Sequence, residues 1–348
     1  MNAKDVPTMK SNPIEGEVRL EGSAAEQGFR MPAEWEKQTC VWLVHPHNHE
    51  TWPGCLDEAK REWEAWRAKL SKVVEVREAG ECGIPTNDSW IRDFGPIFVS
   101  HPTRGIAGHS FRFNGWGDKY EPRVLDDAVP SAISRRCHMP MWHHDFVLEG
   151  GSIDVNGSGT VLTTSQCLES QNRNPHAAQE RIELTLRDAL GVTNIVWIPG
   201  GIKGDDTDGH IDDIARFVSR DTIVALRAPV GHPDHEVLEE NWEVLQAARD
   251  ERGERFKIVA LPVPNPMEYE YPADRFGPGG RSMIPASHAN FLLSNGTAFV
   301  PIFDSGSDDK ALEILAKLLP GWKIEGVMAR NLVVGLGSLH CLSCHQPK

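Results

Sequence analysis

Residues 204–213 read Gly-Asp-Asp-Thr-Asp-Gly-His-Ile-Asp-Asp and place five carboxylates around a single histidine, His210. Because neighbouring like charges repel, such a group is costly unless something cationic offsets the repulsion. A calcium loop is one alternative, but the glutamate expected at its twelfth position is missing. A zinc site through His210 and Asp212 is another, but no second His or Cys stands at ligand spacing. The segment therefore favours a cationic ligand.

The C-terminal segment 335–345 reads Gly-Leu-Gly-Ser-Leu-His-Cys-Leu-Ser-Cys-His and carries two of the seven cysteines. It contains Cys-x-x-Cys-His, the attachment pattern of c-type haem, which requires export to an oxidising compartment. A redox pair is a second interpretation, although such pairs normally stand at a strand-to-helix junction. A third is that Cys341 is a nucleophile, because a thiolate is the strongest nucleophile that a side chain offers near neutral pH.

Three further segments carry polar or aromatic residues that packing does not require. The segment 86–96 holds Asp88, Trp90 and Asp93, 113–117 holds Trp116, and 147–151 places Glu149 directly before two glycines. Taken singly, each has an ordinary structural explanation. The first is a capped turn with a surface ion pair, the second is a turn beside an aromatic that packs in the core, and the third is one acid beside a flexible backbone.

Taken together, the segments match the chemistry of guanidinium hydrolysis. A guanidinium is planar, permanently charged and forked, so carboxylates in its plane must hold it, and Asp93 and Asp212 can do so. Cys341 can attack its central carbon. One histidine, His210, can protonate the departing ammonia and later deprotonate water. A carboxylate at Glu149 can fix the histidine's tautomer, and this chemistry needs neither a metal nor another cofactor.

Composition and charge are consistent with this interpretation. The formal net charge of −14 disfavours a nucleic-acid or anionic-membrane partner, since phosphates need clustered Lys and Arg. An odd number of cysteines without a disulfide spacing fits a reducing compartment. Residues 1–27 lack the apolar core of a signal peptide and are expected to be a flexible lead-in, and no run approaches the roughly 20 apolar residues of a membrane span. We expect a cytoplasmic protein.

Strand and helix patterns alternate along the chain, which predicts an α/β architecture in one unit. Leu56, Ala59, Trp63, Trp66 and Leu70 recur every three or four residues and predict an amphipathic helix. Further helices are expected in 175–190, 235–252 and 308–319, and 262–285 is expected to be a long loop. Strands are predicted at 40–45, 73–77, 97–99, 159–164, 194–198, 223–226, 257–261, 289–293, 297–303 and 331–334.

Residues 31–347 resemble the agmatine deiminase family of the guanidine-modifying pentein superfamily. The matching stretches are Asn-Asp-Ser-Trp-Ile-Arg-Asp-Phe-Gly-Pro (87–96), Phe-Asn-Gly-Trp-Gly (113–117), Leu-Glu-Gly-Gly-Ser-Ile (148–153), Asn-Arg-Asn-Pro-His (172–176), Gly-Asp-Asp-Thr-Asp-Gly-His-Ile-Asp (204–212) and His-Cys (340–341). The resemblance implies a five-bladed α/β propeller with pseudo-fivefold symmetry over residues 28–348. It also implies agmatine hydrolysis to N-carbamoylputrescine and ammonia, in polyamine biosynthesis, through a covalent amidino-cysteine.

The resemblance also implies roles for individual residues. Cys341, His210, Glu149, Asp93 and Asp212 are the expected catalytic residues, with no cofactor. The expected substrate contacts are Trp90, Trp116, Asp88, Asp206 and Asp208, around a small cationic guanidine. A homodimer is among the assemblies left open. The rivals are an arginine or peptidylarginine deiminase of the same superfamily and a non-catalytic guanidine-binding protein.

The sequence departs from the family's pattern in the cysteine segment and at one position before it. The family's Gly-Gly-Gly-Asn-Ile-His-Cys becomes Gly-Leu-Gly-Ser-Leu-His-Cys, so Leu336 replaces a glycine and Ser338 an asparagine. His288 stands where the family commonly has tyrosine, which is expected to alter a wall of the site. Cys344, close to the nucleophile, raises the hypothesis that oxidation joins Cys341 and Cys344 and stops activity.

Overall fold

Five mixed sheets form the framework of the structure, a computed structural model that describes residues 18–273 and 279–348. Within those ranges each of the five sheets has three strands, and a smaller sheet has two. The three-stranded sheets consist of β1 (Gln38–Leu43), β2 (Glu75–Glu78) and β17 (Ser343–Pro347); β3 (Ile97–His101), β4 (Gly105–Arg112) and β5 (Met141–Val147); β6 (Asp154–Val155), β7 (Thr160–Thr164) and β8 (Asn194–Ile198); β9 (Ala215–Ser219), β10 (Thr222–Arg227) and β11 (Lys257–Pro262); and β14 (Leu292–Ser294), β15 (Thr297–Ile302) and β16 (Lys323–Met328).

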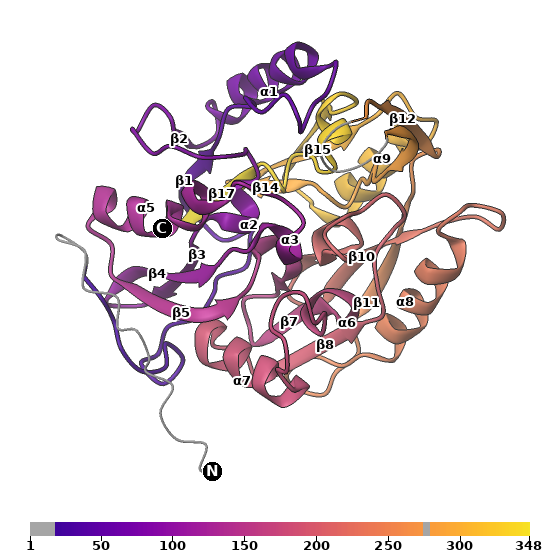
Figure 1. Ribbon diagram of the computed structural model, residues 1–348. Coiled ribbons are helices and arrows are strands. Elements are labelled where there is room, and N and C mark those ends of the chain that lie inside the picture. Colours follow the sequence, from indigo (N-terminus) through magenta and orange to yellow (C-terminus); the bar gives the residue numbers. More distant parts are fainter. Residues whose placement is uncertain (1–17, 274–278) are drawn as a thin grey trace, which may run out of the picture.

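The same connection pattern is repeated in all five sheets. The central strand pairs antiparallel with one neighbour and parallel with the other. Parallel strands need a crossover, and a helix supplies it each time. The crossover helices are α1 (Leu56–Leu70), α5 (Val129–Cys137), α7 (Gln179–Leu190), α8 (His235–Ala247) and α9 (Asp308–Leu318). In the first sheet β1 pairs with the C-terminal strand β17, so an early and a late segment of the chain lie side by side there (Figure 1).

In three of these sheets a short helical segment comes before an edge strand. Before β3 lies α2 (Ile91–Phe94), before β6 lies η1 (Gly150–Ser152), and before β9 lies η2 (Ile211–Asp213). The remaining short elements are α3 (Gly115–Asp118), α4 (Val124–Asp127), α6 (Ser165–Leu168) and η3 (Leu332–Gly335). α2 contacts η1 and η1 contacts η2, so polar residues far apart in sequence are brought to one place.

The predicted apolar stripe of α1 is confirmed, because Leu56, Ala59, Trp63, Trp66 and Leu70 are its buried residues. Asp57 and Glu58 occupy its first turn and Arg67 and Lys69 its last, which complements the helix dipole. Burying each such apolar side chain contributes about 1.5–3 kcal/mol. Strand β8 has the predicted bounds, and the predicted helices 175–190, 235–252 and 308–319 correspond to α7, α8 and α9 with later starts or earlier ends.

Two local predictions are wrong. The apolar run 331–334 is not a strand, because Leu332–Gly335 forms η3 and Glu62 binds the backbone N–H groups of Asn331 and Leu332. Periodicity alone cannot separate a short buried strand from a buried helical turn. The expected loop 262–285 contains a hairpin of β12 (Met267–Tyr271) and β13 (Gly280–Ile284).

The described part of the expected lead-in lies against the first half of the chain. The N–H of Leu20 donates to the carbonyl of Met141, and Ala24 packs in a buried cluster with Phe29 and Trp142. Residues 18–27 are therefore held in place, and residues 1–17 lie outside the described residues. No helix in the described ranges combines the length and apolar character needed to cross a membrane.

Candidate active site

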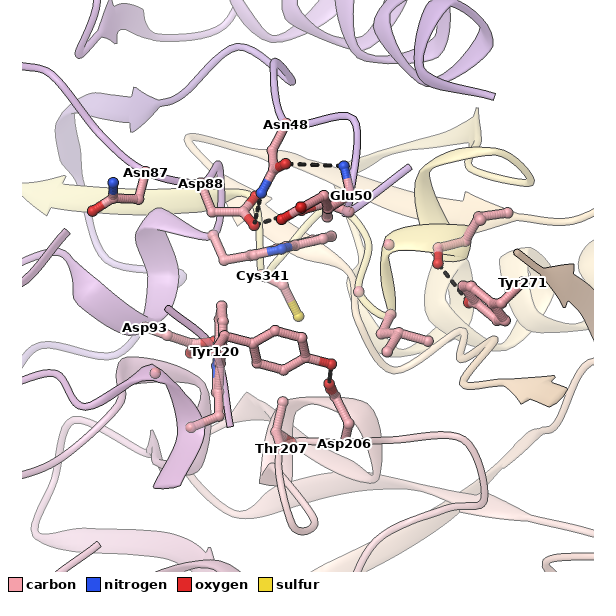
Figure 2. A pocket seen from close by; sticks show the side chains of 18 of the residues that line it. Asn48, Glu50, Asn87, Asp88, Asp93, Tyr120, Asp206, Thr207, Tyr271 and Cys341 are labelled. Atoms are coloured by element: carbon pink, nitrogen blue, oxygen red, sulfur yellow. Dashed lines mark hydrogen bonds between the residues drawn. The ribbon is translucent and has the colours of Figure 1, made fainter. Parts of the chain in front are cut away.

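A cavity of about 920 Å³ opens over the point where the short segments meet. Cys341 lies on its wall and is only 5% exposed. Figure 2 shows the sulfur of Cys341 pointing into the cavity, with Asp93 and Tyr120 nearby. Acids, aromatic rings and glycines make up much of the lining, so the cavity suits a cation with an apolar stem.

Five segments supply the centre of this site. Each segment leads into the edge strand that occupies the equivalent position in its own sheet. Asp93 precedes β3, Glu149 precedes β6, and His210 and Asp212 precede β9. Asn290 precedes β14 and Cys341 precedes β17. The repeated sheet topology therefore explains why five catalytic candidates scattered through the sequence lie together.

Asp93 and Asp212 hold their carboxylates in fixed positions. Asp93 accepts hydrogen bonds from Trp116 Nε1 at 2.9 Å and from the Gly151 N–H at 3.0 Å. Asp212 Oδ2 lies 2.6 Å from Nδ1 of His340, while its Oδ1 is buried and has no hydrogen-bond partner among the described residues. A buried acceptor left unpaired is costly, so Oδ1 is ready for a donor from a ligand.

His210 lies between two acids. Its Nδ1 is 3.5 Å from Asp93 Oδ1 and its Nε2 is 3.8 Å from Glu149 Oε2. Burial alone would lower the pKa of His210, but the charge of Asp93 and the neighbouring Cys167 and Glu149 raise this pKa well above its ordinary value. The ring is therefore an imidazolium in the free protein, with a proton available for a leaving group.

Glu149 is held by a buried arginine. The Nε of Arg173 donates to both of its carboxylate oxygens, at 3.0 and 2.9 Å, and both side chains are fully buried. Burial would raise the pKa of Glu149, but the charges of Arg173 and His210 lower this pKa to about 2. Glu149 therefore remains a carboxylate beside the His210 imidazolium.

The cysteine is a neutral thiol while the site is free. Burial raises the pKa of Cys341 well above its ordinary value, and the charges of Asp212, Asp213 and Asp93 raise it further. A cation bound between these carboxylates would offset that repulsion and lower the pKa of the thiol. Activation of the nucleophile is thus coupled to the charge of the ligand.

Both glycines after Glu149 are required by close contacts. A Cβ on Gly151 would stand 2.6 Å from His210 Nδ1 and 2.7 Å from Asp93 Oδ1. A Cβ on Gly150 would collide with the carbonyl oxygen of Arg92. Only glycine allows the backbone N–H of residue 151 to reach Asp93.

Of the predicted tail contacts, four line the cavity and one does not. Trp90, Trp116, Asp88 and Asp206 are lining residues. Asp208 is not one of them, and its carboxylate instead binds Lys119 and Arg173, both at 2.7 Å. Asp208 therefore supports Arg173.

The two acids on the outer wall differ in how their oxygens are used. Both oxygens of Asp88 accept hydrogen bonds, from the Ser89 N–H on one side and from Thr51 and Asn48 on the other. Asp206 accepts the Tyr120 hydroxyl on Oδ2, as Figure 2 shows. Burial raises the pKa of Asp206 to about 6, so it is ionised at neutral pH.

Two groups in the described ranges bring potential metal ligands within 4.8 Å of one another: Glu149 with Cys167 and His210, and Asp212 with Asp213 and Cys341. Both groups consist of the catalytic candidates and their immediate neighbours. In the first, Arg173 already binds both oxygens of the carboxylate.

The departures from the family pattern have limited effects. The hydroxyl of Ser338 donates to Asn290 Oδ1 at 2.9 Å, which ties the cysteine segment to its neighbour. His288 does not line the cavity, so the expectation that it alters the wall is wrong, because its ring bonds Pro301 and Ser307 in the interior. Leu336 lines the cavity with a left-handed backbone, at φ 72°.

Cys341 and Cys344 are both free and buried. The thiol of Cys344 lies in β17 and contacts the carbonyl of Pro96 at 3.4 Å, whereas the sulfur of Cys341 contacts Asn290. Their joining by oxidation remains a prediction.

Sequence patterns missed several site residues. Arg173 stood in a recognised stretch without a role, and Asn290 lay two positions beyond the His288 departure. Glu34, far away in sequence, binds His340 at 2.7 Å and pairs with the buried Arg216 at 3.0 Å. An acid within Met-Pro-Ala-Glu-Trp gives no local signal for such a contact.

The chain is similar to known proteins over almost its whole length. Residues 30–347 match the family model of the Porphyromonas-type peptidyl-arginine deiminase. The agmatine deiminase of Pseudomonas syringae pv. tomato is 33% identical, covering 94% of this chain and 98% of that one. The structure of the agmatine deiminase of Enterococcus faecalis superposes with a TM-score of 0.89 at 30% identity, over 95% of this chain and 99% of that one. DDAH from Pseudomonas aeruginosa, at 12% identity, TM-score 0.52 and coverage of 89% and 99%, shares the fold alone.

Proposed function

The chain belongs to the Porphyromonas-type peptidyl-arginine deiminase family of the pentein superfamily, and we propose that it is an agmatine deiminase. It hydrolyses agmatine to N-carbamoylputrescine and ammonia. The observation that carries the proposal is a buried cluster behind two residues of the cavity wall, Cys341 and Asp93. His210 lies 3.5 Å from Asp93 and 3.8 Å from Glu149. Asp212, whose Oδ2 lies 3.7 Å from the Cys341 sulfur, keeps a buried Oδ1 that is unpaired among the described residues.

In the first half-reaction the guanidinium lies between Asp93 and Asp212. Its positive charge offsets the acids around Cys341, and the thiol loses its proton to solvent water. The thiolate forms a bond with the central carbon of the guanidinium. His210 donates its proton to one terminal nitrogen, the bond from carbon to that nitrogen breaks, and ammonia leaves.

In the second half-reaction water cleaves the amidino-cysteine. His210, now neutral, takes a proton from the attacking water, and Glu149 stabilises the imidazolium that results. Oxygen bonds to the carbon, the carbon–sulfur bond breaks, and the departing thiolate takes the second proton of the water, which restores the thiol. The product is a ureido group, and the water supplies its oxygen.

The lining favours agmatine over arginine. An α-carboxylate would need an unpaired cation on the cavity wall. Arg123 is the one Lys or Arg among the described lining residues, and it is already paired with Asp118 at 2.7 Å and with Glu121. The outer wall instead offers Asp88 and Asp206, which suit the terminal ammonium of agmatine.

The deciding experiment measures ammonia release from agmatine, free arginine and a blocked arginyl peptide. We expect agmatine to give the highest kcat/KM. Selective release of ammonia from arginine or from the peptide would support the same chemistry but would show that agmatine is not the preferred substrate. Tight binding of agmatine without release from any of the three would establish a guanidine-binding protein instead.

Replacement of Asp206 by asparagine is expected to lower kcat/KM for agmatine about tenfold or more, because a charge-assisted contact to the ammonium is lost. Butylguanidine, which lacks the amine, should be hydrolysed by Asp206→Asn and by the wild type at similar rates. The same loss with both substrates would mean that Asp206 shapes the wall without binding the amine.

The proposal also covers the fold, the cellular location and the assembly of the protein. We infer that the five similar sheets are the blades of a single α/β propeller over residues 28–348, as their repeated strand order supports. All seven cysteines are free thiols, which supports a reducing, cytoplasmic location. A homodimer remains a prediction.

A further inference from the structure

One of the five converging segments has no role in the chemistry described so far. Those before β3, β6, β9 and β17 supply an acid, an acid, a histidine with an acid, and the nucleophile. The segment before β14 supplies Asn290, which is 1% exposed. Asn290 precedes β14 in the same way that the catalytic candidates precede the edge strands of their own sheets. Its amide, however, has no function in the steps described above.

Asn290 contacts the reacting sulfur directly. Its Nδ2 lies 3.0 Å from Cys341 Sγ and 3.0 Å from Asp213 Oδ1. Its Oδ1 accepts from the Ser338 hydroxyl at 2.9 Å and from the His340 N–H at 3.0 Å. The amide therefore joins the nucleophile, its supporting turn and η2.

The orientation of the amide follows from its partners. The backbone N–H of His340 can only donate, so the atom facing it must be the oxygen. Flipping the amide would place an NH₂ group against that N–H and leave two donors in conflict. The nitrogen must therefore face the sulfur, and it can donate to a thiolate.

The other charged groups around the sulfur oppose a thiolate. Asp212 and Asp213 face it from η2 and Asp93 faces it from α2, and each raises the pKa of Cys341 after the larger effect of burial. The hydrogen bond from Asn290 acts in the opposite direction and lowers the pKa of the thiol. A donor is thus placed at the atom on which negative charge develops.

We propose that Asn290 is a catalytic residue that donates a hydrogen bond to the Cys341 thiolate and holds the 338–341 turn in the attacking geometry. The catalytic part of this inference rests on the proposed function, while the contact with the sulfur is independent of it. A donor already in place needs no rearrangement when the charge forms.

The test measures how fast iodoacetamide alkylates Cys341 in the full chain at fixed pH without substrate, read by peptide mass, alongside kcat and KM for agmatine. Asn290→Ala removes the donor. Asn290→Asp keeps an oxygen toward His340 and loses the donor. We expect alkylation at pH 8 to fall about tenfold, which corresponds to a rise of about one unit in the pKa of the thiol. We expect kcat to fall about tenfold to a hundredfold with little change in KM.

Asn156→Ala is the matched control. Asn156 is also buried, and its amide binds the carbonyl of Arg220 and the carboxylate of Glu251 away from the cavity. It should leave the alkylation rate of Cys341 unchanged. Wild-type alkylation and kcat in Asn290→Asp would overturn the proposal, and this variant decides if Asn290→Ala fails to fold. Absence of ammonia release by the wild type would refute the proposed function alone, because alkylation needs no substrate.

Discussion

Cys341→Ala is expected to lower kcat for agmatine by about 10⁴-fold or more, because no other thiol lies among the described lining residues. The remaining residues can still bind and polarise the substrate, but a water molecule attacking the guanidinium without a thiolate is far slower. Ammonia release in single and multiple turnover measures this loss.

Intact-protein mass makes the result specific. During turnover the wild type should carry an added amidino group on Cys341, and Cys341→Ala should carry none. Binding of agmatine to Cys341→Ala, measured by calorimetry, should persist, since Asp93 and Asp212 are unchanged. Full activity in Cys341→Ala would refute the covalent mechanism, and loss of binding together with activity would point to a damaged fold.

In the free enzyme, burial and nearby negative charges keep the Cys341 thiol protonated. Burial and three neighbouring acids raise the pKa of Cys341, so the thiolate fraction is small at neutral pH when no cation is bound. A guanidinium between Asp93 and Asp212 adds a positive charge, which lowers that pKa. A thiolate at Cys341 is therefore favoured only where a cation is bound, and oxidation of an idle thiolate is limited.

The sequence indicated the catalytic candidates because their chemistry is unusual for their positions. Five acids around His210, and Glu149 before two glycines, are hard to explain by packing. The structure places Glu149 beside His210 and Asp212 beside Cys341. The stripe of α1 was equally predictable, since a helix with one apolar face has a strong period.

Other features depend on contacts between distant segments, which a single sequence does not contain. Asn290 reads as an ordinary polar residue after Ala-Ser-His, and Glu34 becomes important only because His340, far along the chain, lies 2.7 Å away. The orientation of the Asp208 carboxylate depends on its ion pairs with Arg173 and Lys119. The sequence therefore assigned no role to Asn290 and Glu34, and it predicted a substrate contact for Asp208, which does not line the cavity.

Asp212→Asn is expected to lower kcat/KM for agmatine about a thousandfold. The buried Oδ1 of Asp212 is an unpaired acceptor, and the amide can present an N–H where the guanidinium also presents N–H groups. The substitution removes one of the charges that hold the cation and turns a donor–acceptor contact into a donor–donor conflict. In a water-excluded site each effect costs about 1.5–3 kcal/mol, and together they account for the expected loss.

Asp308→Asn is the control for loss of a buried aspartate. Asp308 accepts from the backbone N–H groups of Phe303 and Ser305 and does not line the cavity. It should keep kcat/KM near that of the wild type. Asp93→Asn should resemble Asp212→Asn, and the double variant should lose much less than the product of the two losses, because either change alone breaks the same grip on the guanidinium. Independent, multiplicative losses would show that the two carboxylates act on different parts of the substrate.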